Sequence, residues 1–185
     1  AARIKPVIVM KAGRHREGSR AAVSHTGALL GGDDVFDAAL ARAGAVRVLT
    51  IQQLFAAAQV LSGSYRVRNN RLAIVTNGGG PAVIAADRAA EVGVALPQLG
   101  EETAKRLERL VPTQRQRQNP VDLLADADPD RYQQALEACL ADDGIDGVLA
   151  MLAPQAQSDP DAVAERVIAC ARGRKPVLSC WLGEE

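Results

Sequence analysis

The sequence predicts an α/β protein with two parallel-sheet domains, the first of which is incomplete within these 185 residues. Apolar, β-branched runs alternate with runs of helical periodicity along the chain, which is typical of parallel sheets covered by helices. The polar, turn-rich stretch "GSYRVRNN" interrupts this alternation, so we expect domains over 1–63 and 70–185 and a linker over 64–69. Only two strand-like runs precede that stretch, which is too few for a complete sheet.

The first domain is expected to contain two strands and two helices. The expected strands are 6–12 and 45–49, and the expected helices are 33–44 and 50–62. Asp33 or Asp34 can cap the first helix, Gly44 can end it, and Thr50 can cap the second. Residues 13–32 are rich in Gly, Arg and Ser, so we expect a loop there.

The second domain reads as most of a doubly wound domain. Its expected strands are "RLAIVT", "DGVLAMLA" and "KPVLSCWL", and its expected helices are "PAVIAADRAAEVG", "EETAKRLERLV", "DPDRYQQALEACLAD" and "PDAVAERVIACARG". Asp128 is the expected cap of the third helix, with Pro129 in its first turn. Leu107, Leu110 and Val111 form an apolar stripe that we expect to lie in the core.

Composition excludes several classes of function. The 22 basic and 22 acidic side chains cancel and aromatic residues make up 3%, so nothing favours binding to nucleic acid or an anionic membrane. No apolar run approaches the roughly 20 residues of a membrane span. Cys139, Cys170 and Cys180 have no metal-ligand spacing and read as reduced thiols, so a cytoplasmic location is expected. Two histidines are too few for most zinc sites, and no metal site is predicted.

His25 is the first candidate functional residue. It lies in "AAVSHTGALLGG", where its neighbours are small. A neutral imidazole is nucleophilic and titrates near neutrality, so His25 can act as a nucleophile or general base. The alternative is a loop histidine that hydrogen-bonds a neighbouring carbonyl. The other histidine, His15, lies in a basic loop and is expected to have a surface role.

The turn "TNGGGPAV" is the second candidate. Glycines after a strand let backbone N–H groups approach an anion at the start of a helix. The sequence lacks the full dinucleotide fingerprint, and a tight strand-to-helix turn is an equal alternative. The helix that begins near Pro129 offers another positive dipole end. The carboxylates Asp122, Asp126, Asp128 and Asp130 read as turn and cap residues, and no catalytic carboxylate pair is predicted.

Four segments, in this order, resemble the nucleoside-diphosphate-forming acyl-CoA (acetate-CoA) synthetases, relatives of succinyl-CoA synthetase. They are "KPVIVMKAGRHREGSRAAVSHTGALLGGDDVFDAALARAGAVRV", "RLAIVTNGGGPAVIAADRAAE", "NPVDLLADADPDRYQQAL" and "KPVLSCWLGEE". The resemblance implies two flavodoxin-like, succinyl-CoA-synthetase-like domains. It also implies that His25, which matches the transiently phosphorylated histidine of that family, is the catalytic residue.

The resemblance further implies which residues and cofactors take part. Phosphate-binding residues are expected beside the histidine, in the glycine turn and before the third helix: Ser24, Thr26, Gly27, Asn77, Gly78, Gly79, Gly80, Ala125 and Asp126. CoA, ATP or ADP, phosphate and magnesium are expected to bind the full-length protein, with no cofactor inside this fragment. The partners are then acyl-CoA, phosphate and nucleotide, held through the missing domains of an oligomer. The carboxylate that orients the imidazole is expected upstream of residue 1.

Two other functions stay open from the sequence. The second segment also resembles fusions that carry a GNAT acetyltransferase, in which the ligase-like half is a regulatory module of a protein lysine acetyltransferase. Some of those fusions have lost the histidine, whereas this chain keeps it, which favours retained ligase chemistry. A plain α/β interaction domain is the third reading. In all three cases we expect the isolated fragment to be inactive as a ligase.

Overall fold

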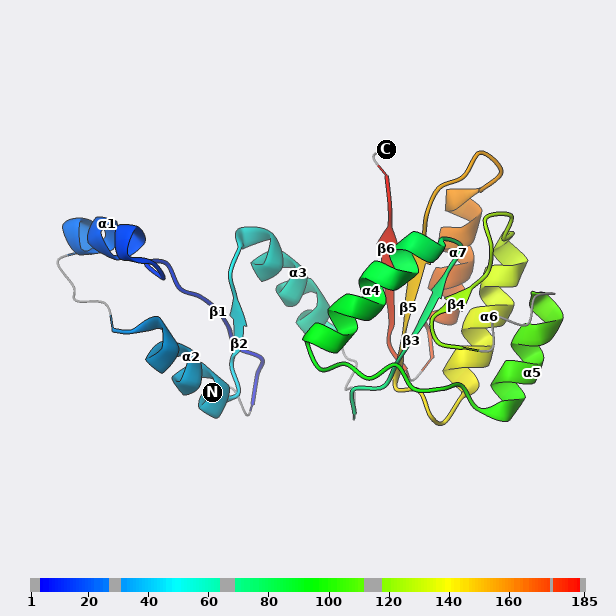
Figure 1. Cartoon of the computed structure of the whole chain (residues 1–185), viewed down its shortest axis with the longest axis horizontal. Helices are drawn as coiled ribbons and strands as arrows, with labels where there is room; N and C mark the ends of the chain where they lie inside the picture. Colours follow the sequence, from blue (N-terminus) through cyan, green and yellow to red (C-terminus); the bar gives the residue numbers. More distant parts are fainter. Residues whose placement is uncertain (1–3, 27–30, 64–68, 112–117, 174, 184–185) are drawn as a thin grey trace. The chain divides into compact units, whose positions relative to one another are not determined.

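The computed structural model describes residues 4–26, 31–63, 69–111, 118–173 and 175–183, and for His25 and Thr26 the backbone alone. The chain divides into two compact units, Ala1–Ser64 and Tyr65–Glu185. Every described strand pair in both units is parallel, and helices alternate with strands (Figure 1). The predicted α/β class with parallel sheets is therefore confirmed.

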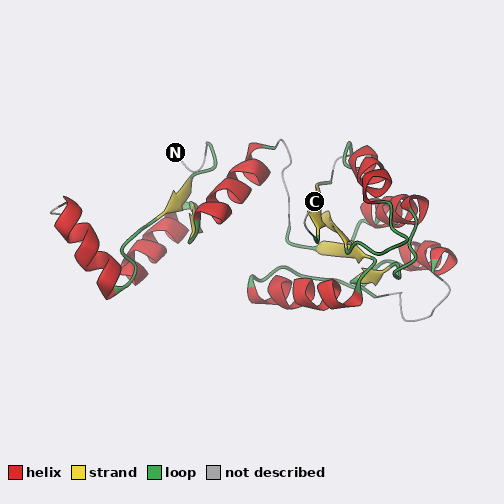
Figure 2. Cartoon of the chain, turned by 90° about the horizontal axis from the view of Figure 1, so that it is seen from above, coloured by secondary structure: helices red, strands yellow, loops and turns green. Residues whose placement is uncertain are grey.

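Unit 1 is a two-stranded parallel sheet with three helices. Its elements are β1 (Ile8–Met10), α1 (Arg16–Thr26), α2 (Asp33–Ala43), β2 (Val46–Val48) and α3 (Ile51–Ser62). In the strand pair, Ile8 lies opposite Val46 and Met10 opposite Val48. Helices α2 and α3 lie on either side of the strands, and α1 stands away from them (Figures 1 and 2).

Helix α1 corrects the expectation of a loop over 13–32, which was wrong for residues 16–26. The apolar residues of this segment, Ala21, Ala22 and Val23, are consecutive, so they do not produce the three- or four-residue spacing that identifies a helix. Alanine nevertheless has the highest helix propensity, and Glu17 in the first turn interacts favourably with the helix dipole. Part of the expected loop, residues 27–30, lies outside the described residues.

Of the three helix ends predicted in unit 1, the cap at Thr50 and the end at Gly44 are confirmed. The Thr50 hydroxyl accepts a hydrogen bond from the Gln53 backbone N–H at 3.1 Å, and Gly44 ends α2 with φ of 69°. The expected cap at Asp33 or Asp34 is wrong, since Gly32 occupies the cap position and both aspartates lie in the first turn. The Asp33 carboxylate is instead engaged by Lys11 and Arg47.

Unit 2 is a four-stranded parallel sheet in the order β4-β3-β5-β6. Its elements are β3 (Leu72–Thr76), α4 (Gly79–Glu91), α5 (Glu101–Leu110), β4 (Val121–Asp122), α6 (Pro129–Ala141), β5 (Gly147–Leu152), α7 (Pro160–Cys170) and β6 (Val177–Trp181). Helix α4 covers one face of the sheet, while α5, α6 and α7 cover the other (Figures 1 and 2). Strand β4 pairs with one edge of β3, and the next strand, β5, pairs with the other edge of β3. The point where the strand order reverses, the topological switch point, therefore lies between β3 and β5.

The core of unit 2 lies between the sheet and helices α5, α6 and α7. Leu107 and Val111 are each 1% exposed and Leu110 packs against the same core, as the apolar stripe predicted. Asp128 caps α6 by accepting a hydrogen bond from the Arg131 backbone N–H at 2.7 Å, and Pro129 occupies the first turn as expected. None of the described helices combines the length and apolar character that crossing a bilayer requires.

Candidate functional site

His25 lies in the last turn of α1, one residue before the helix ends. Ser24 precedes it and is exposed. The side chains of His25 and Thr26 and the whole of Gly27 lie outside the described part of the chain. The backbone therefore places the candidate nucleophile at the carboxyl end of an exposed helix and not in the loop that its small neighbours predicted.

Asn77 joins the two strands at the switch point of unit 2. It follows β3 directly and is 2% exposed. Its side-chain amide donates to the Ala153 carbonyl at 2.9 Å and accepts from the Ala153 N–H at 2.8 Å, just after β5 ends. Both polar atoms of this side chain are thus engaged. The geometry gives Asn77 a structural role, and its predicted role in phosphate binding stays a prediction.

Tyr132 holds the same two strand ends from α6. Its side chain is fully buried, and its hydroxyl donates to the Met151 carbonyl at 2.9 Å. The backbone N–H of Asn77 also donates to the hydroxyl oxygen of Tyr132. Burial raises the pKa of Tyr132 well above its usual value, so the hydroxyl keeps its proton and its donor role. Sequence reasoning missed this residue, because its partners are remote in the chain.

The three glycines lie at the start of α4, and close packing explains one of them, Gly78. A Cβ on Gly78 would lie 3.1 Å from the Ala153 Cβ and 3.3 Å from the Pro81 Cδ, so a side chain there would be crowded. A Cβ on Gly79 would lie 3.4 Å from an Asp122 carboxylate oxygen. That carboxylate already places negative charge beside the positive end of the helix dipole, so a phosphate there would meet like charge.

Asp122 makes a contact in the structure that the sequence analysis did not predict. It ends β4, the strand next to β3, and its carboxylate also accepts from the Leu124 N–H at 2.9 Å. Leu124 has φ of 68°, which is uncommon for a residue with a side chain. The predicted turn role of Asp122 is therefore confirmed, and the structure adds its approach to Gly79.

Ala125 and Asp126 lie at the same carboxyl edge of the sheet, between β4 and α6, and both are exposed. The Arg131 guanidinium contacts the Asp126 carboxylate at 2.8 Å and also donates to the Leu123 carbonyl at 3.0 Å. This guanidinium holds the pKa of Asp126 below its usual range. The structure thus brings the glycine turn and the Ala125–Asp126 segment to one edge of the sheet, after two adjacent parallel strands.

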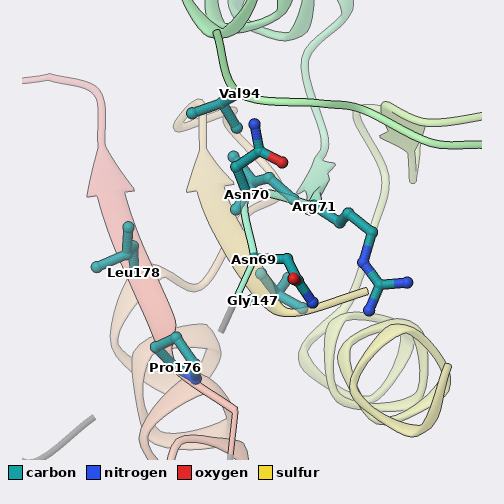
Figure 3. Close-up of a pocket in the computed structure, with 9 residues that line it drawn as sticks. Asn69, Asn70, Arg71, Val94, Gly147, Pro176 and Leu178 are labelled. Carbon is teal, nitrogen blue, oxygen red and sulfur yellow. The ribbon is translucent and has the colours of Figure 1, made fainter. Parts of the chain in front are cut away.

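The opposite, amino edge of this sheet holds an apolar hollow of about 180 Å³ (Figure 3). It is lined by residues at the starts of β3, β5 and β6 and by Val94, and none of the predicted site residues is among them. Within the described ranges, no group of three or more His, Cys, Asp or Glu side chains could hold a metal ion. The candidate residues of unit 2 therefore lie at the carboxyl edge, where open parallel sheets bind ligands.

A parallel sheet with its switch point between β3 and β5, and with polar residues after the strand ends, defines a flavodoxin-like α/β unit. Residues 1–61 of the chain match the succinyl-CoA ligase like flavodoxin domain. The chain is 40% identical over 184 residues to an ADP-forming acetate–CoA ligase of Archaeoglobus fulgidus, covering all of this chain and 26% of that protein. It is 35% identical to the alpha subunit of an ADP-forming acetate–CoA ligase of Pyrococcus furiosus, covering 96% of this chain and 40% of the subunit.

A solved structure of an enzyme with a related name is also similar to this chain. The acetyl-coenzyme A synthetase 1 of Ca. Korarchaeum cryptofilum, in complex with phosphate and ADP, superimposes with a TM-score of 0.90 at 30% identity. The match covers 97% of this chain and 39% of that chain. The chain is therefore a homologue of one segment of the ADP-forming acyl-CoA ligases and spans between 26% and 40% of the length of these relatives.

Proposed function

We propose that this chain is the part of an ADP-forming acyl-CoA synthetase that carries a phosphoryl group on His25. The observation that carries the proposal is the match to an ADP-forming acetate–CoA ligase along the full 184 aligned residues, including the segment around His25. The reaction proposed for the complete protein is acyl-CoA + phosphate + ADP giving carboxylate + CoA + ATP.

The chemistry divides into three balanced steps. Phosphate attacks the thioester carbonyl, and CoA leaves as its thiol, so an acyl phosphate forms. A neutral ring nitrogen of His25 then attacks the phosphorus in line, and the carboxylate leaves. Finally, the β-phosphate oxygen of ADP attacks the phosphohistidine, which returns His25 to its neutral form and yields ATP. The reverse direction makes the thioester from ATP.

Phosphohistidine carries negative charge that backbone N–H groups can stabilise. We propose that the hydroxyl groups of Ser24 and Thr26 and the backbone of Gly27 supply this stabilisation beside the histidine, because N–H groups inside α1 donate within the helix. The exposed Ala125–Asp126 segment before α6 is proposed as a phosphate-binding segment of unit 2. The pairing of Asp126 with Arg131 supports this choice, because the guanidinium offsets the charge of the carboxylate. The start of α4 is the weaker candidate, since Asp122 already supplies an anion there.

The other substrates are proposed to bind outside this chain. CoA and ADP or ATP are assigned to the remaining domains of a longer, oligomeric protein in the cytoplasm, and magnesium would accompany the nucleotide there and neutralise its phosphates. Relatives named for acetate and for 4-hydroxybutyrate are 40% and 35% identical to this chain. The acyl substrate is therefore proposed only as a small carboxylate.

The test uses the complete protein that contains this chain, with any partner subunit, and ATP labelled on its γ-phosphate. The protein should acquire an acid-labile, alkali-stable label, which His25→Asn abolishes. His15→Asn is the matched control, because His15 is the only other histidine in the sequence, and this variant should keep the label. Label that survives His25→Asn, or no label in the unchanged protein, would contradict the proposal and favour the regulatory reading.

A coupled assay of residues 1–185 alone completes the test. We expect no synthesis of acyl-CoA from ATP, carboxylate and CoA, because the proposed nucleotide and CoA sites lie elsewhere. Turnover by this chain alone would place those sites within it.

A further inference from the structure

The segment that carries His25 begins and ends beside the two-stranded sheet of unit 1. It begins at Gly13, after β1, and ends at Asp33, the first residue of α2. Two basic residues lie beside this place: Lys11 follows β1 directly, and Arg47 is the central residue of β2. The strand register places Arg47 opposite Val9, so both cations belong to the two-stranded sheet or to the residue directly after it.

Both cations hold the end of the segment. The Arg47 guanidinium donates to the two carboxylate oxygens of Asp33 at 2.6 and 2.7 Å, and the Lys11 ammonium donates to one of them at 3.3 Å. The side chains of Lys11 and Arg47 are 10% and 13% exposed. The Asp33 side chain is 27% exposed, so these pairs are partly removed from water and are screened less than fully exposed pairs. They hold Asp33 against both strands.

The start of the segment is held at the same place. The Gly13 carbonyl accepts a hydrogen bond from the Ser19 hydroxyl at 2.9 Å and a longer one from the Lys11 ammonium at 3.5 Å. Gly13 has φ of 70°, and a Cβ on Gly18 would lie 3.3 Å from the Gly13 Cα. The first turn of α1 therefore packs on Gly13, and one ammonium contacts both ends of the segment.

Neighbouring groups reinforce this arrangement. The Phe36 ring of α2 lies 5.5 Å from the Lys11 nitrogen and 5.9 Å from the Arg47 guanidinium carbon, within the range of a cation–π contact. Arg47 also contacts Asp37 at 3.1 Å, and Arg14 reaches Asp33 at 3.9 Å. The Arg47 guanidinium, helped by Lys11, holds the pKa of Asp33 below its usual range, so this carboxylate stays charged at neutral pH.

We propose that Lys11, Asp33 and Arg47 form a clasp that fixes both ends of segment 13–33 and thereby positions His25 for phosphoryl transfer. The second half of this statement rests on the proposed function of His25. The described residues of α1 are exposed or half-buried, so packing along the helix does little to fix its direction. The clasp residues are positioning residues, because they act on His25 through the backbone at the two ends of the segment.

The central variant is Lys11→Met, which removes the ammonium and keeps the length of the side chain. Its matched control is Lys105→Met, which breaks an exposed ion pair with Glu101 on α5, far along the chain in unit 2. Both variants are made in the complete protein. Asp33→Asn is a second clasp variant, which keeps the shape of the side chain while removing its charge.

The first measurement is amide hydrogen exchange of residues 14–24. A hydrogen bond to a charged group is stronger than one between neutral groups, so exchange there should be about tenfold faster in both clasp variants. Exchange in β3, β5 and β6 should not change, which shows that the rest of the protein is folded. Lys105→Met should match the unchanged protein throughout. Unchanged exchange of residues 14–24 in both clasp variants would overturn the clasp.

The second measurement is the rate at which His25 is labelled from γ-labelled ATP. A nucleophile displaced by about 1 Å can lose roughly 100-fold in rate, so we expect a 10- to 100-fold lower rate at saturating ATP with an unchanged KM for ATP. Faster exchange together with a native labelling rate would show that the clasp does not position His25, which overturns the second half of the proposal. If the unchanged protein takes no label, the proposed function fails, while amide exchange still decides whether the clasp exists.

A chemical rescue experiment distinguishes the loss of the Lys11 ammonium from a general loss of folded structure in the variant. Lys11→Cys treated with bromoethylamine regains an ammonium at nearly the original distance from the backbone. We expect slow exchange of residues 14–24 and fast labelling to return. The unchanged protein receives the same treatment, which controls for reaction at the natural cysteines, Cys139, Cys170 and Cys180. Failure of the rescue in a folded, fully modified sample would also overturn the clasp.

Discussion

The two units differ in how much apolar surface they bury. Among the described residues of unit 1, Val48 is the only buried hydrophobic side chain, whereas unit 2 has a continuous core that includes Leu123, Leu136 and Val148 at 0% exposure. Helix α3 of unit 1 leaves Phe55 69% exposed. The two sequences have the same alternation of strands and helices, but a sheet of two three-residue strands cannot cover the helices beside it.

Because the first domain is expected to be incomplete within these 185 residues, the difference describes this chain alone: it shows what a two-stranded sheet leaves uncovered. In unit 2, helices on both faces of a four-stranded sheet exclude water from the central strands, β3 and β5. In unit 1, the helices meet a sheet too narrow to cover their apolar faces. Because hydrophobic burial is the dominant favourable term in folding, the two units should differ strongly in stability.

Separating the units should give the largest effect. Residues 65–185 alone should unfold cooperatively in urea, because their core is contained within this range. Residues 1–64 alone should show no cooperative transition, since 64 residues with so little buried surface cannot offset the loss of conformational entropy. Circular dichroism against urea concentration measures both. A sharp transition in residues 1–64 would break the comparison.

Truncations to alanine should reproduce the difference at single residues. Leu136→Ala in unit 2 should lower the free energy of unfolding by about 2–5 kcal/mol, because it leaves a cavity in a fully buried site. Phe55→Ala in unit 1 should change it by no more than about 0.5 kcal/mol, because the ring is already exposed. Urea denaturation of residues 1–185 checks both, and equal losses would show that α3 is covered.

Removing one hydroxyl should have a smaller effect. Tyr132→Phe in residues 65–185 deletes the group that the Met151 carbonyl and the Asn77 backbone share. The two strand-end groups then lack their partner in the interior, at a cost of about 1–3 kcal/mol. The slope of the urea transition should not change. A variant as stable as the parent would mean that water or a rearrangement satisfies both groups.

The Arg71–Asp146 ion pair should produce the smallest effect, and one that depends on pH. Arg71 contacts Asp146 at 2.7 Å and holds the pKa of this carboxyl well below its usual range. A lowered pKa stabilises the folded state above the unfolded-state value of about 3.9, and this stabilisation is lost as the pH falls further. Asp146→Asn should therefore lower the urea midpoint of residues 65–185 most at pH 7, and the difference from the parent should shrink below about pH 4.

An exposed pair provides the control for that prediction. Glu91 pairs with Arg88 on α4, and both side chains are about two-thirds exposed. Glu91→Gln should leave the urea midpoint nearly unchanged at both pH values, because surface pairs contribute little. A constant difference between Asp146→Asn and its parent from pH 7 to pH 3 would contradict the electrostatic explanation.

The sequence predicted the elements whose local signals agree with their environment. Strands β3 and β5, the caps Thr50 and Asp128 and the glycine that ends α2 all lie where expected, because their signals span only a few residues. Strand β4 was not predicted, because two residues are too few to show an alternating pattern. Helix α1 was missed because it has no apolar stripe. The predicted cap at Asp33 failed because partners 22 and 14 residues away compete for its carboxylate.

The candidate site was predictable only in part, for the same reason. Resemblance to a family singled out His25, and the glycine turn indicated the carboxyl edge of the second sheet. The bonds that organise this edge join residues distant in sequence: Asn77 to Ala153, and Tyr132 to Met151. Such pairings depend on the order of strands in the sheet, which periodicity along one chain does not specify.

The lack of space at Gly78 implies a rule for how this region can change during evolution. A methyl group at position 78 would meet the methyl group of Ala153, so the two positions share a fixed volume. A homologue that gains a side chain at one of them should have lost the side chain at the other. Substitutions at these two positions should therefore be correlated across related sequences, although they lie on different loops.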